Sequence, residues 1–226
     1  MTKTQLSKAK FHFMKATKIK ILQSAIRLFN KQGLTNVRLQ HIADEARISV
    51  GNLAYHFPNK RAIIRQIDGE IENIIEPILL QEHAFPHLID FDNQLSRYYA
   101  LLQRYAFYFL DVLELERAYP VLHLKRKKYI QYMIQQIEQW ILQHELKGMF
   151  KQKLQPNQYQ LIAHAIWMIL TFWMTQQKVS GMGMGNEEAF KEAVWNQLLP
   201  IFTPIGLMEY EAIILPQLKF VNIPDF

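Results

Sequence analysis

The segment between Ser49 and Lys60 combines hydrogen-bonding side chains with a cation. Tyr55 and His56 carry donors, Asn52 carries an amide, and Lys60 follows four residues after His56. Donors and cations suit phosphate oxygens, and an amide can pair with the edge of an adenine base. These residue types indicate binding to a nucleic acid, and no convergent set of catalytic residues accompanies them.

Positive charge is concentrated in the same part of the chain. Residues 1–65 hold thirteen lysines and arginines against two acidic residues, a net +11, so the chain total of +6 leaves −5 for residues 66–226. A basic head on an acidic body is expected when one end of a protein meets a polyanion. The alternative is a basic surface that only keeps the protein soluble.

Other kinds of chemistry find little support. The chain has no cysteine, which excludes disulfides, zinc fingers and thiolate sites. His83 and His87 have a metal-ligand spacing, but Pro86 lies between them and interrupts a helix. The glycines of residues 181–185 imitate a nucleotide loop, yet no strand precedes them. We expect no metal, no cofactor and no enzymatic activity.

The elements that position these side chains are helices. Apolar residues recur at three- and four-residue spacing from Thr17 to Leu215, and no segment alternates with period two, so the fold class is all-α. A first amphipathic helix ends before Gly33, two short helices follow, and a long helix runs from Lys60 to about Glu76, where Pro77 ends or kinks it. Further helices are expected at 93–118, 120–147, 156–178, 186–202 and 207–218.

The two short helices have the pattern of a helix-turn-helix. Ala43 is small enough for a close crossing of the helices, Ile48 and Leu53 close a miniature core, and Ser49 is a good N-cap for the second helix. The outward residues of that helix are those that reach base edges in such motifs; they are Val50, Gly51, Asn52, Tyr55 and His56. This pattern alone also fits an ordinary three-helix bundle.

A longer match makes the assignment more specific. Ile42-Ala43, the segment 48–53 and the segment 55–60 (Tyr-His-Phe-Pro-Asn-Lys) resemble the DNA-binding head of the TetR family. The resemblance implies a flexible basic extension (1–14), a helix-turn-helix domain (15–62) and a helical ligand-binding and dimerisation domain (63–226). The expected DNA contacts are Arg38, Gln40, Ser49, Val50, Gly51, Asn52, Tyr55, His56 and Lys60.

Three residues depart from the family pattern. Ala54 stands where a second aromatic residue is usual, which removes one phosphate contact. Arg47 replaces a turn glycine, so the turn either accepts a left-handed non-glycine residue at a cost of roughly 1 kcal/mol or takes another shape. Arg38 replaces a small hydroxyl residue, which loses a helix cap and adds a cation.

The body of the protein contains a helix that must be buried on more than one side. Residues 161–174 are apolar nearly all round. In the resembling family the last two long helices pair with their dimer mates, which here implies a seam formed by 156–178 and 186–202. Its candidate contacts are Trp173, Trp195, Leu198 and Leu199, and packing inside one chain is the alternative for each of them.

Aromatic residues are dense between the head and this seam. A helical body that encloses a ligand lines the pocket with such side chains and a few polar ones. The candidates are Gln103, Phe107, Gln136, Trp140, His144, His164 and Trp167, and plain core packing is the alternative for each. The expected ligand is small and apolar or aromatic.

The sequence thus predicts a homodimeric repressor of double-stranded DNA that a small ligand releases. The alternative is a DNA-bound protein-interaction factor without a small-molecule effector. Residues 161–174 are shorter than the roughly 20 residues that a membrane span needs. We therefore expect no membrane association, no export and a cytoplasmic location.

Overall fold

The computed structural model describes the backbone of residues 3–80, 86–181, 183 and 185–218, with the side chains of 3–15, 77–80 and 121–125 outside the description. The described residues form helices and loops, and their only β-bridge joins Phe150 to Phe202. The all-α prediction is therefore confirmed. The chain divides into two compact units, Met1–Asn73 and Ile74–Phe226.

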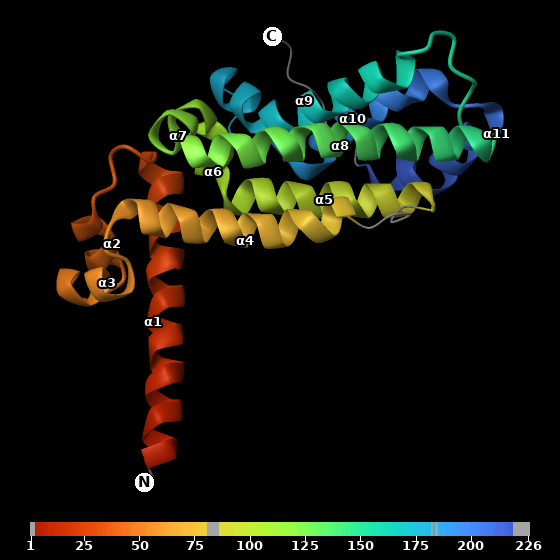
Figure 1. The fold of residues 1–226 in the computed structure, drawn as a ribbon. Helices are drawn as coiled ribbons and strands as arrows, with labels where there is room; N and C mark the ends of the chain where they lie inside the picture. Colours follow the sequence, from red (N-terminus) through yellow and green to blue (C-terminus); the bar gives the residue numbers. More distant parts are fainter. Residues whose placement is uncertain (1–2, 81–85, 182, 184, 219–226) are drawn as a thin grey trace. The chain divides into compact units, whose positions relative to one another are not determined.

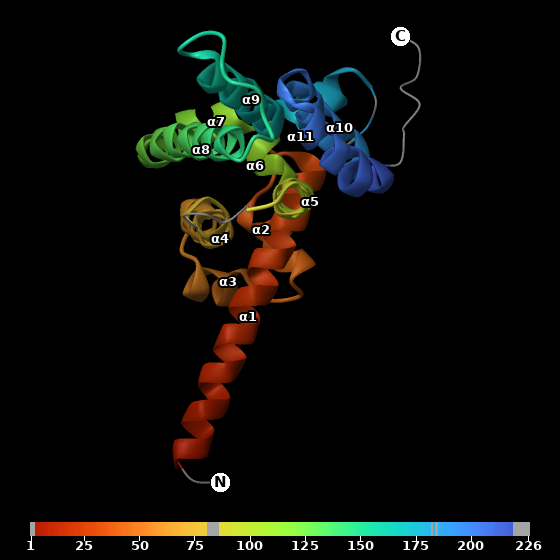
Figure 2. The same cartoon turned by 90° about the vertical axis from the view of Figure 1, so that its right-hand side faces the viewer.

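The N-terminal unit is built on a long helix. Figure 1 and Figure 2 show α2 (Leu39–Glu45) and α3 (Val50–His56) beside α1 (Lys3–Gln32), and α4 (Lys60–Leu80) begins directly after them. Apolar side chains from all four helices are fully or almost fully buried and form the core of the unit; they include Ile21, Ala25, Phe29, Ile42, Leu53, Ile63 and Ile67.

Three expectations for this part of the chain change. The helix α1 already begins at Lys3, in the segment expected to be a flexible extension. The helix α4 continues past Pro77 to Leu80, because one proline removes a single backbone hydrogen bond from a long helix. The sequence placed the domain boundary after residue 62 and the compact units divide after Asn73, and both positions lie inside α4.

The C-terminal unit is a helical bundle. Its main helices are α5 (Leu88–Arg104), α6 (Ala106–Leu110), α7 (Val112–Ala118), α8 (Pro120–Leu146), α9 (Gln158–Val179), α10 (Glu187–Leu198) and α11 (Pro204–Glu209). Short helical turns follow at Leu199–Ile201, Tyr210–Ile214 and Leu215–Gln217. The helices α8 and α9 pack side by side, and α9 also packs against α6 and α10 (Figure 1).

The helix expected over residues 93–118 is three helices. Tyr105 (φ −116°, ψ 39°) separates α5 from α6, and Asp111 (φ −99°, ψ 28°) separates α6 from α7. Neither break contains proline or glycine, so the sequence pattern did not indicate them. Tyr105 is completely buried, which shows that tertiary packing holds the first break.

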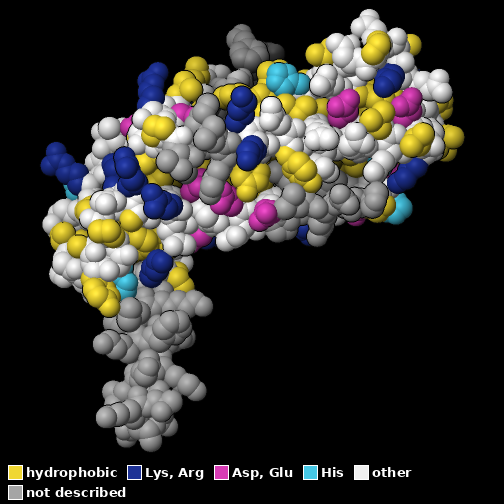
Figure 3. Space-filling model, in the orientation of Figure 1, with side chains coloured by type: hydrophobic (Ala, Val, Ile, Leu, Met, Phe, Trp, Pro, Cys, Tyr) yellow, Lys and Arg dark blue, Asp and Glu magenta, His cyan; other side chains and the backbone are white. Residues whose placement is uncertain are grey.

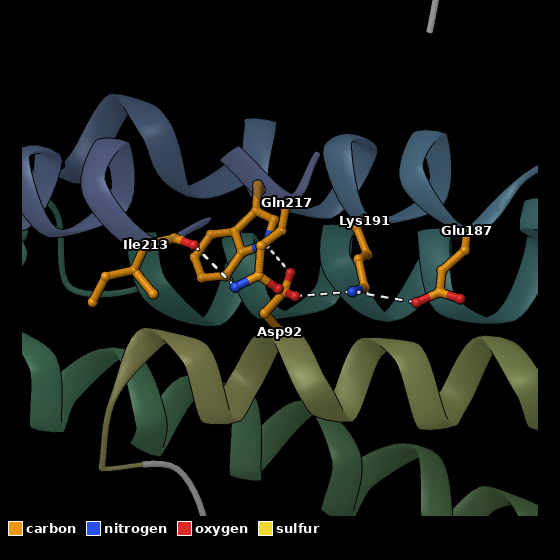
Figure 4. A network of polar contacts seen from close by, with 6 residues as sticks. Asp92, Glu187, Lys191, Ile213 and Gln217 are labelled. Atoms are coloured by element: carbon orange, nitrogen blue, oxygen red, sulfur yellow. Dashed lines mark hydrogen bonds and ion pairs between the residues drawn. The ribbon is translucent and has the colours of Figure 1, made fainter. Parts of the chain in front are cut away.

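A buried polar cluster joins α5 to α10. Asp92 is completely buried, and its Oδ2 accepts from Lys191 Nζ at 2.8 Å while its Oδ1 accepts from Trp195 Nε1 at 3.0 Å (Figure 4). Lys191 also pairs with Glu187 at 3.3 Å. Both carboxylate oxygens of Asp92 are thereby satisfied, which removes most of the cost of burying a charge. The cluster fixes α10 against α5.

Among the helices of the described residues, none has the length and apolar character that crossing a membrane requires.

Candidate nucleic-acid interface

The turn between α2 and α3 has the geometry of a helix-turn-helix. Ala43 and Leu53 are completely buried at the crossing, and the Ile48 backbone N–H donates to Ala43 O at 3.0 Å. Arg47 has φ 51°, so the turn accepts a non-glycine residue in the left-handed region, the first of the two possibilities that the sequence left open.

The helix α3 begins as the sequence predicts. Ser49 is its N-cap, and its Oγ accepts from the Asn52 backbone N–H at 3.1 Å. Within α3 only Leu53 is buried, while the side chains of Val50 and Asn52 are exposed. A short helix with one buried anchor therefore presents most of its surface to solvent.

Tyr55 is the most exposed aromatic residue of the helix. It is 70% exposed, and its ring lies edge-on to that of His56 with 5.3 Å between centroids. His56 is half-buried. The two side chains together form the outer end of α3, where the sequence placed its phosphate contacts.

Two expected DNA contacts at the start of α2, Gln40 within the helix and Arg38 at its N-cap, differ in whether their side chains have a partner in the protein. Gln40 Nε2 donates to Asp44 Oδ1 at 2.7 Å, so its amide is engaged within the helix. Arg38 is exposed and its side chain does not cap α2; instead its backbone N–H donates to His41 Nδ1 at 3.3 Å. The guanidinium of Arg38 is therefore exposed and takes no part in capping α2.

The ammonium of Lys60 lies against the protein's own backbone. Its Nζ donates to Leu34 O at 2.6 Å and to Val37 O at 2.8 Å, both in the connection between α1 and α2, and the side chain is half-buried. The sequence placed Lys60 on a DNA phosphate. These two carbonyl partners tie the start of α4 to the connection between α1 and α2, and the phosphate contact stays a prediction.

Other cations surround this region. Lys18 lies over the Phe57 ring at 5.4 Å, and Arg27 pairs with Glu45 at 3.1 Å between exposed side chains. Figure 3 shows Lys and Arg side chains mixed with hydrophobic ones over the surface that α2, α3 and the start of α4 form. A basic surface of this kind attracts the phosphates of a nucleic acid.

The seven expected pocket residues fall into separate places. Trp140 and His144 meet with their ring centroids 4.4 Å apart, and Phe91 stacks on Trp140 at 4.3 Å. Gln103 instead donates to Tyr99 Oη at 2.6 Å. The other four are Phe107, which is buried, Gln136, which is half-buried, and His164 and Trp167, which stack on each other along α9.

His144 is the most unusual member of this set. It is 1% exposed, its Nδ1 lies 2.9 Å from Trp140 O, and its Nε2 has no partner among the described residues. Burial lowers the pKa of His144, so the ring is neutral near pH 7. The His144 ring has aromatic neighbours, and the centroid of the Phe150 ring lies 5.7 Å from its own.

A surface groove of about 430 Å³ lies between α8 and α9. Its lining is Gln131, Ile134, Gln135, Glu138 and Gln160, and none of the seven expected residues is among them. Four of these five side chains are polar, which does not match the apolar ligand that the sequence predicts.

Two of the expected dimer contacts lie in the chain's own core. Trp195 and Leu198 are completely buried within one chain, and Trp195 is held by Asp92, so neither can reach a partner. Trp173 and Leu199 are half-buried. For Trp195 and Leu198 the alternative of intramolecular packing is therefore correct.

The helix α9 carries exposed apolar side chains that were not among the expected dimer contacts. Leu161, Met168, Phe172 and Val179 are 57%, 46%, 43% and 84% exposed. Their separations of seven, four and seven residues place them along one side of a helix. We call these four residues the α9 stripe (Leu161, Met168, Phe172 and Val179). Their spacing is visible in the sequence, but the helix is apolar nearly all round, so the sequence does not show which side stays exposed.

Replacing Lys60 with methionine separates its two possible roles. We expect Lys60→Met to lower the free energy of unfolding of the N-terminal unit by about 1–3 kcal/mol, because two hydrogen bonds from a charged donor are lost. Urea titration followed by far-UV circular dichroism measures this change. Arg65→Met, which removes an exposed cation from the same helix, is the control. If Lys60→Met leaves stability unchanged and lowers the salt dependence of DNA binding, Lys60 contacts a phosphate and has no structural role.

Models of one protein family match the two parts of the chain. The model described as "Bacterial regulatory proteins, tetR family" matches residues 21–67. A second TetR model, described as "Bacterial transcriptional repressor", matches residues 67–211. The first match contains the whole helix-turn-helix, and the second covers more than half of the chain.

Individual proteins agree with these matches. A probable HTH-type transcriptional regulator, YttP of Bacillus subtilis, is 33% identical over 55 residues, which cover 24% of this chain and only 27% of that protein. A TetR-family transcriptional regulator from Marinobacter aquaeolei is 26% identical in sequence, with a TM-score of 0.75 over 88% of this chain and 96% of that one. CprB from S. coelicolor shares the fold, with a TM-score of 0.66 and 15% identity over 88% and 94% of the two chains. With its helix-turn-helix and its helical body, the chain belongs to the TetR family of DNA-binding transcriptional regulators.

Proposed function

We propose that this regulator is a repressor that binds an operator as a homodimer and leaves it when a small apolar or aromatic ligand binds. The observation that carries the DNA-binding part is the exposed surface of α3, fixed to the head by Leu53 and by its Ser49 cap. A helix held in this way enters a major groove without reorganising.

The residues proposed to contact DNA form two groups. Arg38, Tyr55 and His56 bind phosphates and set affinity, whereas Val50, Gly51 and Asn52 face base edges. Gln40 and Ser49 are weaker candidates, because the Gln40 amide and the Ser49 hydroxyl already have partners inside the protein. Lys60 acts through its hold on the α1–α2 connection.

Two substitutions test the phosphate contacts. We expect Tyr55→Phe to weaken operator binding about tenfold with an unchanged salt slope, because a neutral hydroxyl releases no counterion. Arg38→Ala is expected to lower the slope of log K against log [salt] by about 0.9 for each protomer. Fluorescence anisotropy at several salt concentrations measures both. If neither variant changes binding to an operator selected by the wild-type protein, the proposed interface is wrong.

The homodimer is proposed to form through the α9 stripe. Its four apolar side chains are exposed in a single chain, and exposed apolar side chains along one side of a helix are typical of a surface that packs against a partner. A dimer places two copies of α3 in successive major grooves, about 34–36 Å apart. Phe172, in the middle of the stripe, is the most informative position.

A charged residue in the stripe tests the dimer. We expect Phe172→Glu to give monomers in light scattering at micromolar concentration, because an unpaired carboxylate cannot be buried cheaply in the interface. Operator affinity falls with it. Leu154→Glu, at a side chain that is 90% exposed in the loop before α9, is the control and leaves the dimer intact. A dimeric Phe172→Glu protein would place the interface elsewhere.

The ligand is proposed to act near Trp140 and His144. Among the described residues the buried His144 Nε2 has no partner, and the ring lies near those of Trp140 and Phe150. This suits a ligand that is mostly aromatic and carries one hydrogen-bonding group. Such a ligand enters by displacing part of the aromatic cluster. The ligand releases DNA if it binds one conformation of the C-terminal unit more tightly than the conformation that is present on the operator.

A thermal-shift screen of small aromatic compounds tests the ligand. We expect a hit to raise the melting temperature and to release the operator, and His144→Phe to remove both effects while the protein stays folded. Gln136→Leu, a change at another expected pocket residue, shows whether the effect is specific to His144. If compounds stabilise the protein without releasing DNA, the alternative of a protein-interaction factor without a small-molecule effector gains support.

A further inference from the structure

The surface of α3 divides into rows with different chemistry. Residues four apart lie above one another on a helix. Val50 and Ala54 therefore form an apolar row, Asn52 and His56 form a polar row, and Tyr55 lies between them above Gly51. The row members at the start of the helix are exposed, and Val50 is 37% exposed although it is aliphatic.

The surface of α3 contains neither lysine nor arginine. The sequence of the helix is VGNLAYH, so it lacks the side chains that pair best with the O6 and N7 acceptors of guanine. Two polar side chains just outside α3 that could also reach a base already have partners in the protein. Ser49 Oγ caps the helix, and the Gln40 amide donates to Asp44. Thymine offers a methyl group in the major groove, and adenine offers a donor and an acceptor to an amide.

Gly51 lets this surface approach the bases closely. A Cβ at Gly51 would meet only Ser49 Oγ, at 3.9 Å, so neither packing nor the backbone conformation of the fold requires glycine there. Alanine would make a better helix. A glycine that the fold does not need, at the centre of the exposed face, leaves room for base pairs against the backbone.

We propose that α3 recognises a half-site of A·T pairs, with thymine methyl groups packed on the row of Val50 and Ala54 and an adenine paired with the Asn52 amide. This inference rests on the proposed DNA-binding function and specifies its target. Specificity comes from methyl contacts and one amide, while the cations at Arg38 and Arg47 lie outside α3 and serve the backbone of the duplex.

Selection of operators from a random DNA library by the full-length dimer gives the first test. The selected half-sites are expected to hold A·T pairs at the positions that α3 contacts. Each thymine is then replaced by deoxyuridine, which removes only the methyl group. The thymines on the apolar row lose about fourfold in affinity, which corresponds to about 0.8 kcal/mol for one buried carbon, and the other thymines serve as internal controls.

Crossed substitutions assign each contact to a side chain. Val50→Ala is expected to reduce the sensitivity to deoxyuridine at the thymine that Val50 contacts, and Asn52→Ala to remove the sensitivity to 7-deazaadenine, which lacks the N7 acceptor. Each variant retains the sensitivity that belongs to the other row, because the two contacts are independent. Gly51→Ala keeps or raises thermal stability and weakens operator binding at least about tenfold.

The outcomes distinguish this inference from the function on which it rests. Selected half-sites with G·C pairs opposite α3, or indifference of the wild-type protein to every deoxyuridine, would overturn the inference while the regulator still binds its operator. Failure to enrich any sequence would instead contradict the proposed function.

Discussion

The hydrogen bonds from Lys60 Nζ to Leu34 O and Val37 O fix the frame on which the exposed surface of α3 depends. They join the first residue of α4 to the connection between α1 and α2, so the helix-turn-helix is held from outside its own small core. An ammonium bound to two carbonyls is a strong contact, and its partners are backbone atoms that no substitution removes. Motion at the start of α4 must therefore move α2 or break these bonds.

The C-terminal unit also contains a buried polar group whose hydrogen bonds hold two helices together within apolar packing. Asp92 binds Lys191 and Trp195 where α5 meets α10, and both of its oxygens are occupied. His144 shows the contrasting case, a buried ring with one nitrogen that lacks a partner among the described residues. The first arrangement gives rigidity, and the second leaves a position where a ligand gains a hydrogen bond.

Local features were predictable from the sequence because they depend on neighbouring residues. The Ser49 cap and the crossing at Ala43 follow from residue type and short spacing, whereas for Arg47 the sequence left two turn shapes open and the structure has the left-handed one. The structural role of Lys60 did not follow, since its partners lie 23 and 26 residues away in the chain. Trp195 was misjudged for a related reason, because apolar periodicity shows that a residue is buried but not whether its own chain or a second copy covers it.

The open space at Gly51 has a consequence for how this regulator can change over time. An alanine at this position would alter the surface presented to DNA without disturbing the packing of the head, because its Cβ would make one ordinary contact among the described side chains, with Ser49 Oγ at 3.9 Å. Most positions of a small three-helix unit are constrained by its core. After duplication of the gene, a single codon at Gly51 could therefore give two copies different operators while their folds stay the same.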